Sequence, residues 1–165
     1  MTEERVADGQ RLVDIEAELR DRLMKLVENQ LVGVLSTTSE GEPYSCLVSF
    51  WFTENLENLV FATKRARLKY RKMMQNPNVS LIIDDRKNRP DDFQRVISAT
   101  VMGTARDTEG ELRKRYMEAL LERHPYLSEF VRAPDTAIIE VSVKRIYIVA
   151  DFEDVTTVTP GRDNS

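Results

Sequence analysis

Apolar residues recur at three- and four-residue steps in two parts of the chain, which is the spacing typical of amphipathic helices. The first helix is predicted over about residues 10–30, and a second follows Thr108-Glu109-Gly110-Glu111, which fits a capping box, and ends near His124-Pro125. The residues expected on the buried faces of these two helices are Leu12, Ile15, Leu19, Leu23, Leu26, Val27, Leu112, Tyr116 and Leu120. Residues 126–131 predict a short extra helical turn.

Between and after these helices, apolar residues alternate with polar ones or form short runs, as in β-strands. The predicted strands are residues 31–38, 44–52, 59–63, 79–84, 95–106 and 136–150. Gly41 lies in the turn that joins the first two strands, and a basic helix over about residues 65–75 stops before Pro77. Since most consecutive strands are joined by short turns, the pattern predicts an α+β fold whose core is a small, six-stranded antiparallel β-barrel with flanking helices.

Composition narrows the possible classes of protein. The chain has 165 residues, of which 41% are hydrophobic and 32% charged, and this predicts one globular domain over 1–165, with the barrel at about 31–150 and a short C-terminal tail. The net charge of −4 argues against a nucleic-acid partner. With one cysteine and one histidine, the sequence predicts no metal site. A polar start and the lack of a long apolar run predict a cytoplasmic protein without a membrane partner.

One basic segment stands out in this acidic chain. Its cations are Lys64, Arg65, Arg67, Lys69, Arg71 and Lys72, and no acid occurs from Asn58 to Ile83. Cations at the start of a helix oppose the helix dipole, whereas exposed amides and cations together bind an anion such as phosphate. We therefore expect Lys64, Arg67 and Lys69 to form an anion site, to which Thr63 could add a hydroxyl. The alternative is a solvated helix face, which we favour for Arg71 and Lys72.

The strand at residues 45–50, which is expected to form a hairpin with the strand at 59–63, could line a cofactor crevice. Its alternation places Ser45, Leu47 and Ser49 on one face, and Cys46, Val48 and Phe50 on the other. The alternative, an ordinary half-buried strand with Cys46 as a small buried side chain, is the commoner meaning of this pattern, and Trp51 is expected in the core or an interface. The aspartates of residues 84–92 are interpreted as a solvated loop with internal charge pairs.

Reactive side chains are scarce in this sequence. His124 is expected to cap a helix, and a haem-ligand role is the alternative. The sequence offers no acid–base pair, so no catalytic residue is predicted, and any enzymatic chemistry would come from a bound cofactor.

Several of these motifs occur together in one family. The chain resembles the pyridoxamine 5′-phosphate oxidase-like family of flavin-binding split barrels, and in layout its oxidase-related and haem-utilisation branches. The matching segments are Gly41-Glu42-Pro43, Leu47-Val48-Ser49-Phe50, Phe61-Ala62-Thr63, Arg67, Lys69, Asn76-Pro77, Val79-Ser80-Leu81 and Met102-Gly103-Thr104-Ala105.

The resemblance implies a Greek-key split barrel and a homodimer that holds FMN at the subunit interface. By position, Ser45 to Phe50 and Ala62-Thr63 would contact the flavin ring and ribityl chain. Lys69, with Lys64 or Arg67, would hold the phosphate. The implied function is a flavin-dependent oxidoreductase with a small-molecule substrate. A non-catalytic flavin- or haem-binding module, or a reductase that uses a deazaflavin, is the alternative.

The chain departs from its relatives at positions that bear on the activity. Ser45 and Phe50 stand where the true oxidases have a basic residue and a lysine, and Ser98 replaces a flavin-contacting glutamine. The C-terminal segment that binds pyridoxal is not expected here. Residues 151–154 lack the histidine of the haem-degrading branch. We therefore expect neither vitamin B6 oxidation nor haem turnover, unless His124 substitutes.

Overall fold

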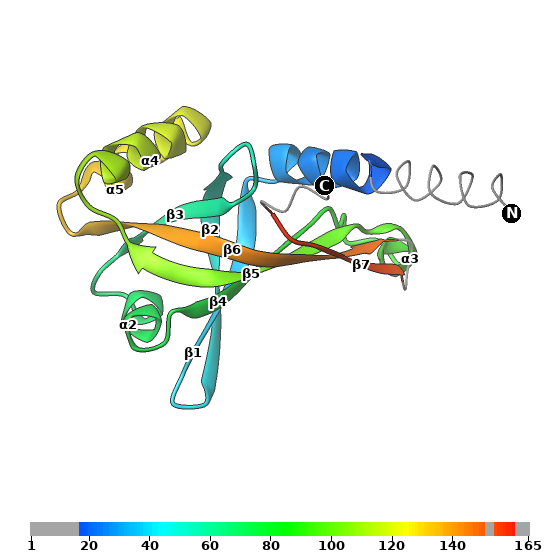
Figure 1. Ribbon diagram of the computed structural model, residues 1–165, viewed down its shortest axis with the longest axis horizontal. Coiled ribbons are helices and arrows are strands. Elements are labelled where there is room, and N and C mark those ends of the chain that lie inside the picture. Colours follow the sequence, from blue (N-terminus) through cyan, green and yellow to red (C-terminus); the bar gives the residue numbers. More distant parts are fainter. Residues whose placement is uncertain (1–16, 151–153, 161–165) are drawn as a thin grey trace, which may run out of the picture.

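The computed structural model describes residues 17–150 and 154–160, and its ribbon is built around one strongly bent sheet (Figure 1). The strands are β1 (Val32–Ser39), β2 (Glu42–Phe52), β3 (Asn58–Lys64), β4 (Asn78–Asp84), β5 (Ser98–Asp107), β6 (Thr136–Ala150) and β7 (Asp154–Val158). The helices are a first helix at 17–29, α2 (Leu68–Gln75), α3 (Asp92–Arg95), α4 (Gly110–Arg123), the 3-10 turn η1 (Pro125–Leu127) and α5 (Ser128–Arg132).

The sheet closes into a barrel. Its strand order is β3-β2-β1-β4-β5-β6-β7, and β3 also pairs with β6 from Asn58↔Ser142 to Lys64↔Thr136. All of these pairings are antiparallel, so the predicted six-stranded antiparallel barrel with flanking helices is confirmed. The sequence did not predict β7, which pairs with the second half of β6 from Ile146↔Val158 to Ala150↔Asp154.

The barrel is split between β2 and β3. Strand β2 pairs with β1 from Val32↔Ser49 to Ser39↔Glu42, but it pairs with β3 only from Phe50↔Phe61 to Phe52↔Leu59. Residues 42–49 of β2 therefore have a ladder partner on one edge only, among the residues that the structure describes. Helix α2 lies beside this opening, since the ammonium of Lys72 lies 3.1 Å from the backbone oxygen of Glu42.

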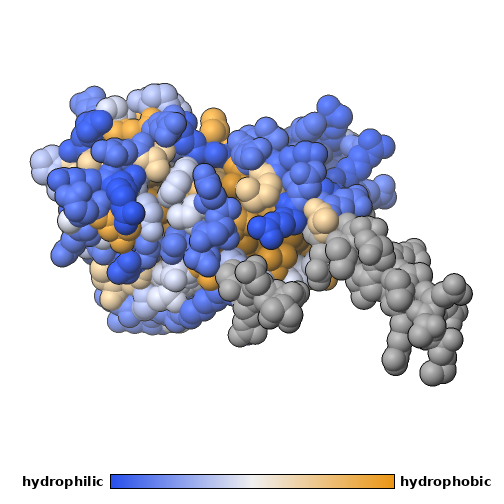
Figure 2. Space-filling model, turned by 45° about the horizontal axis from the view of Figure 1, so that its top comes forward, coloured by the Kyte–Doolittle hydropathy of each residue, from blue (hydrophilic) through white to orange (hydrophobic). Residues whose placement is uncertain are grey.

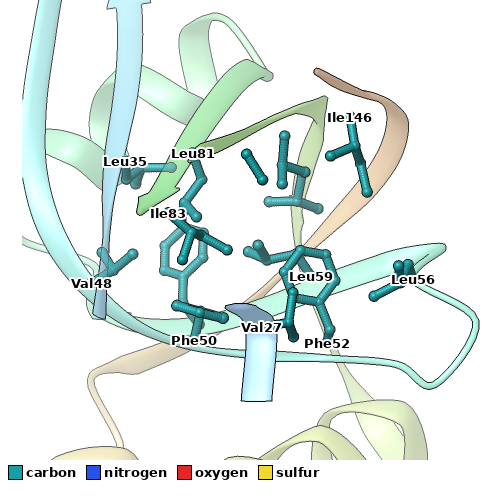
Figure 3. Close-up of a cluster of buried hydrophobic side chains, with 14 of the residues drawn as sticks. Val27, Leu35, Val48, Phe50, Phe52, Leu56, Leu59, Leu81, Ile83 and Ile146 are labelled. Atoms are coloured by element: carbon teal, nitrogen blue, oxygen red, sulfur yellow. The ribbon is translucent and has the colours of Figure 1, made fainter. Parts of the chain in front are cut away.

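Inward-facing side chains from every barrel strand fill the interior. Figure 3 shows Leu35, Val48, Phe50, Leu59 and Ile83 pointing toward one another, and all of them are buried. Val27 of the first helix joins this cluster, which explains the apolar stripe of that helix. Each such side chain contributes roughly 1.5–3 kcal/mol by leaving water. The described part of the first stripe is confirmed, whereas Leu12 and Ile15 lie outside the described residues.

A second, smaller cluster lies on the outer face of the barrel under α4. It contains Val60, Tyr116, Leu120, Val131 and Ile138, with Trp51 packed against it. Tyr116 and Leu120 are therefore buried as the helical spacing predicts, and Trp51 has the expected packing role. Over the face seen in Figure 2, most of the described surface is hydrophilic, with apolar side chains visible between polar ones.

Local signals account for most turns and helix ends. Glu40 and Gly41 both have positive φ (53° and 78°), which suits the two-residue turn between β1 and β2. Helix α2 ends at Gln75, before Pro77, as predicted. No helix among the described residues is long and apolar enough to cross a membrane.

Two helix starts differ from the prediction. Helix α2 begins at Leu68 rather than Arg65, because the Arg65 amide bonds to Asp135 O (3.1 Å) and Arg67 is extended. Helix α4 has Glu109, not Thr108, at its N-cap. The Thr108 hydroxyl instead donates to Ile138 O at 2.6 Å, so the expected capping box does not form.

Candidate functional site

The predicted crevice residues of β2 alternate as expected. Ser45 and Leu47 are exposed and Ser49 is half-buried, whereas Val48 and Phe50 belong to the core. The Ser45 hydroxyl lies 3.0 Å from that of Ser36 on β1. The side chains of Val48 and Phe50 therefore point into the core, away from any ligand in the opening. Residues 48 and 50 could contact such a ligand only through their backbone groups.

Cys46 and Lys69 are brought together across the opening. Cys46 lies half-buried on the inward face of β2, and Lys69 lies in the first turn of α2. Burial raises the pKa of the Cys46 thiol, and the charge and hydrogen bond of the Lys69 ammonium oppose this rise. The thiol therefore stays protonated near neutral pH, and an ammonium group is held at the mouth of the split.

Helix α2 begins with an uncapped turn. Its N-cap, Arg67, makes no side-chain cap bond, the first turn contains no acid, and the first helical hydrogen bond runs from Arg71 N to Arg67 O at 3.3 Å. Neither Arg67 nor Lys69 forms an ion pair among the described residues. The uncapped backbone amides of the first turn, together with the side chains of Arg67 and Lys69, form an arrangement that binds an anion.

The cations that precede the helix have partners from distant strands. The Lys64 ammonium lies 2.6 Å from Asp135 Oδ1 and 5.4 Å from the centre of the Phe130 ring. A hydrogen bond from Lys64 holds the pKa of the Asp135 carboxyl below its ordinary value. Lys64 is thus engaged in this structure, and its expected help with a phosphate remains a prediction.

The end of β3 contributes little side-chain surface to the opening. Thr63 is buried and its hydroxyl donates to Lys64 O at 3.4 Å, while Ala62 is half-buried. The expected hydroxyl contact from Thr63 would require this side chain to turn.

The environment of Lys72 differs from the one that the sequence predicts. It was expected on a solvated helix face, but only 7% of the residue is exposed. Its ammonium approaches Ser39 Oγ (3.4 Å) and Glu42 O (3.1 Å), so it ties α2 to the β1–β2 hairpin. A buried ammonium needs such oxygen partners, which no local pattern reveals.

Asp107 and Asp135 lie beside the basic segment, and sequence reasoning missed them, as it missed their neighbour Tyr70 within the segment. Asp107 accepts from Arg65 and Tyr70, and Asp135 pairs with Lys64. No local signal marks these acids, because they come from distant parts of the chain and meet the segment only when β3 pairs with β6.

No cluster of three or more histidine, cysteine or acidic residues that could hold a metal occurs within 17–150 and 154–160. In the loop after β4, Arg86 pairs with Asp84, so the predicted internal charge pairing is confirmed there. Arg95, predicted to open a strand, instead ends helix α3, where it pairs with Asp91, and β5 begins at Ser98.

A pocket of about 230 Å³ lies between the first helix and the loop after β4. It is lined by Arg22, Lys25, Leu26, Asn29, Gln30, Asp85, Arg95 and Ile97. None of the predicted site residues contributes to it.

A family model for pyridoxamine 5′-phosphate oxidase matches residues 19–150, which include the whole barrel. The chain belongs to this family. No curated protein matches the sequence.

Several solved structures share the fold. A putative pyridoxamine 5′-phosphate oxidase from Listeria innocua has a TM-score of 0.61 and 19% identity, over 79% of this chain and 98% of that chain. A FAD-binding protein from Mesorhizobium loti has a TM-score of 0.60 and 15% identity, over 74% and 88%.

A haem-binding protein from Mycobacterium smegmatis gives a TM-score of 0.72 with 20% identity, over 81% of this chain. The present chain spans only 55% of that protein's length. Proteins of this fold are thus described as binding flavin or haem, and at these identities the likeness establishes the fold alone.

Proposed function

We propose that this protein is an FMN-dependent oxidoreductase that acts on a small-molecule substrate. The observation that carries the proposal is the start of α2, where uncapped backbone amides lie together with Arg67 and Lys69. This helix start adjoins the edge of β2 that has no ladder partner among the described residues, since Lys69 interacts with Cys46. A phosphate monoester carries the negative charge that this arrangement lacks. The flavin ring would lie along residues 45–50 of β2.

The residues of the opening fit this cofactor in kind. Arg67 and Lys69 would bind the phosphate, and the unpaired backbone groups of β2 would hydrogen-bond the ring edge, with Ala62 and Thr63 near the ribityl chain. Ser45 and Ser49 add hydroxyl groups on the outer face. Bound FMN would supply hydride or electron transfer at its ring, and the chain's part is to bind and orient the cofactor.

We further propose that the working form is a homodimer with the cofactor at the subunit interface. An apolar row crosses the outer face of the sheet, because Val34 lies opposite Leu47 on one side and Ile82 on the other. Leu47 is 68% exposed and Ile82 37% exposed. The row begins on the strand that carries the proposed flavin site, so a second copy that covers it would also close that site.

Light scattering should give a dimer mass, and Leu47→Asp should yield monomers with weakened FMN binding.

The absorbance spectrum of the purified protein tests the cofactor assignment. Flavin bands, with release of FMN on denaturation, would support the proposal. Release of FAD, a Soret band of haem, or binding of a deazaflavin alone would each contradict FMN. Haem ligation by His124 is disfavoured, because this residue is fully buried and both ring nitrogens have partners in the protein.

A non-catalytic flavin carrier is the second candidate. This candidate is supported because the proposed cofactor-binding residues, 45–50, 62–64, 67 and 69, include no histidine and no carboxylate that could transfer a proton. Anaerobic addition of NADH or NADPH to the FMN-loaded protein separates the two candidates. Bleaching of the flavin bands supports an oxidoreductase, whereas an unchanged spectrum supports a carrier.

A further inference from the structure

The short connection between β3 and α2 is held by a dense set of contacts. The Arg65 amide bonds to Asp135 O, and the Arg65 guanidinium reaches Pro134 O (3.3 Å) and Thr136 O (3.5 Å). The Arg67 amide closes a turn onto Lys64 O at 3.0 Å. The segment that delivers Arg67 and Lys69 is therefore fixed against the start of β6.

A single carboxylate oxygen joins this segment to the helix that follows. Asp107 Oδ2, at the end of β5, lies 3.1 Å from Arg65 Nε and 2.9 Å from the Tyr70 hydroxyl. Arg65 precedes the N-cap of α2, and Tyr70 is in its first turn. One acceptor thus fixes the chain on both sides of the N-cap Arg67.

The surroundings make this contact stronger than an ordinary surface ion pair. Only a fifth of the Asp107 side chain is exposed, and the Tyr70 ring packs against the core cluster. Burial and the Asp107 carboxylate raise the pKa of the Tyr70 hydroxyl, so it remains a hydrogen-bond donor at neutral pH. Hydrogen bonds to a charged group contribute more than neutral ones, and partial burial reduces screening by water.

Asp107 also removes one cation from the anion site. Its carboxylate neutralises Arg65, and Asp135 pairs with Lys64. Between Lys64 and Tyr70, Arg67 and Lys69 are then the cations that have no ion pair among the described residues. The acid is therefore placed to fix both the geometry and the charge of the start of α2.

We propose that Asp107 is a positioning residue, which acts through Arg65 and Tyr70 to hold the first turn of α2 in place to bind a phosphate monoester. This inference rests on the proposed function, and it adds a residue that itself does not touch the cofactor. Loss of the Asp107 charge would also free the Arg65 guanidinium, which by itself favours an anion. The proposal predicts that the lost positioning outweighs this gain, so that recognition of the phosphate weakens more than recognition of the flavin ring.

Binding of FMN and riboflavin to four forms of the full chain tests this proposal. We compare the wild type with Asp107→Asn, Tyr70→Phe and the control Glu140→Gln. Glu140 is a matched control, because it also accepts from an arginine and a tyrosine, Arg106 and Tyr116, but beneath α4. Flavin fluorescence quenching gives the two dissociation constants.

Asp107→Asn should weaken FMN binding about tenfold and leave riboflavin binding within about twofold. Tyr70→Phe keeps the ring and removes only the hydroxyl, so it should give the same pattern with a smaller FMN effect. Glu140→Gln should leave both constants nearly unchanged. Equal weakening of FMN and riboflavin in Asp107→Asn, or an unchanged FMN constant, would overturn the proposal.

Amide hydrogen exchange separates this test from the proposed function. The amides of Arg67 and Arg71 should exchange faster in Asp107→Asn and Tyr70→Phe than in the wild type and Glu140→Gln. If the wild type binds no flavin, the proposed function fails, and exchange alone decides whether Asp107 fixes the start of α2. Unchanged exchange at both amides in the two variants would refute the positioning role.

Discussion

The Nε2 atom of His124 lies 2.8 Å from the backbone oxygen of Phe50, which joins the end of α4 to β2. The other ring nitrogen, Nδ1, lies 3.2 Å from the Tyr126 hydroxyl. His124 is the C-cap residue of α4, as expected, but its ring hydrogen-bonds to the barrel strand β2 rather than to the last carbonyls of its own helix. The histidine therefore connects a helix to the strand that carries the proposed flavin site.

This burial predicts a pH-dependent stability. Burial lowers the pKa of His124, the Phe50 oxygen opposes this shift, and the nearby Arg123 cation adds to it. The unfolded chain takes up a proton near pH 6.5 and the folded chain only at a lower pH, so the free energy of unfolding should fall as the pH drops below about 7.5, by up to about 1.4 kcal/mol per unit. Urea unfolding of wild type and His124→Gln measures this, and parallel pH profiles would exclude His124 as the cause.

Lys69→Ala should weaken FMN binding at least about tenfold, because it removes one of two available cations from the proposed phosphate site. The control is Arg71→Ala, which removes an exposed cation from the same helix. Lys72 would be a poor control, since it is buried and holds the hairpin. Fluorescence titration gives both constants, and the assignment fails should the two variants lose affinity alike.

Lys72→Ala should destabilise the fold by about 2 kcal/mol, because it leaves a gap and deprives Glu42 O and Ser39 Oγ of their donor. Arg71→Ala should stay within about 0.5 kcal/mol of the wild type. Urea midpoints measure the difference, and similar midpoints for the two variants would mean that the buried contacts of Lys72 contribute nothing.

Gly103→Ala should destabilise the barrel more than Gly33→Ala. A Cβ at Gly103 would collide with the backbone oxygen of Ser142, beside the register shift between β5 and β6. A Cβ at Gly33 would instead meet the flexible end of Leu81 at 2.7 Å. We expect a cost of about 3 kcal/mol against about 1 kcal/mol, measured by urea unfolding. The reverse order would mean that the bulge relaxes more easily than the Leu81 side chain.

Sequence patterns were most reliable where one face of an element is buried. Strand β6 begins and ends where its Ile- and Val-rich run does, at Thr136 and Ala150, because its first half is buried on both faces and its second half mainly on one. The start of α2 was placed too early, since its limit depends on a bond between Arg65 and Asp135 that only the closed barrel creates.

The candidate site was only partly predictable for the same reason. Charge counting along the chain identified the basic segment, but it could not distinguish Lys64, which meets Asp135, from Lys69, which meets Cys46. Nor could it identify Lys72 as buried. The role of each cation depends on partners that are distant in sequence. The alternation of residues within β2 predicts which side chains share a face, but it does not predict which edge of the strand lacks a neighbour.

The pairing of β3 with β6 also bears on when the protein can fold during its synthesis. Asn58 and Ser142 are opposite each other in this seam, so β3 must wait until residues up to Ser142 have emerged from the ribosome before its outer edge is covered. Contacts between such distant segments make folding slow and leave strand edges exposed to other chains. Pro134 and Asp135, which directly precede the same late strand, and Thr136, which begins it, help to hold the connection from β3 to α2. A nascent chain would therefore form the proposed phosphate site only after β6 has emerged and paired with β3.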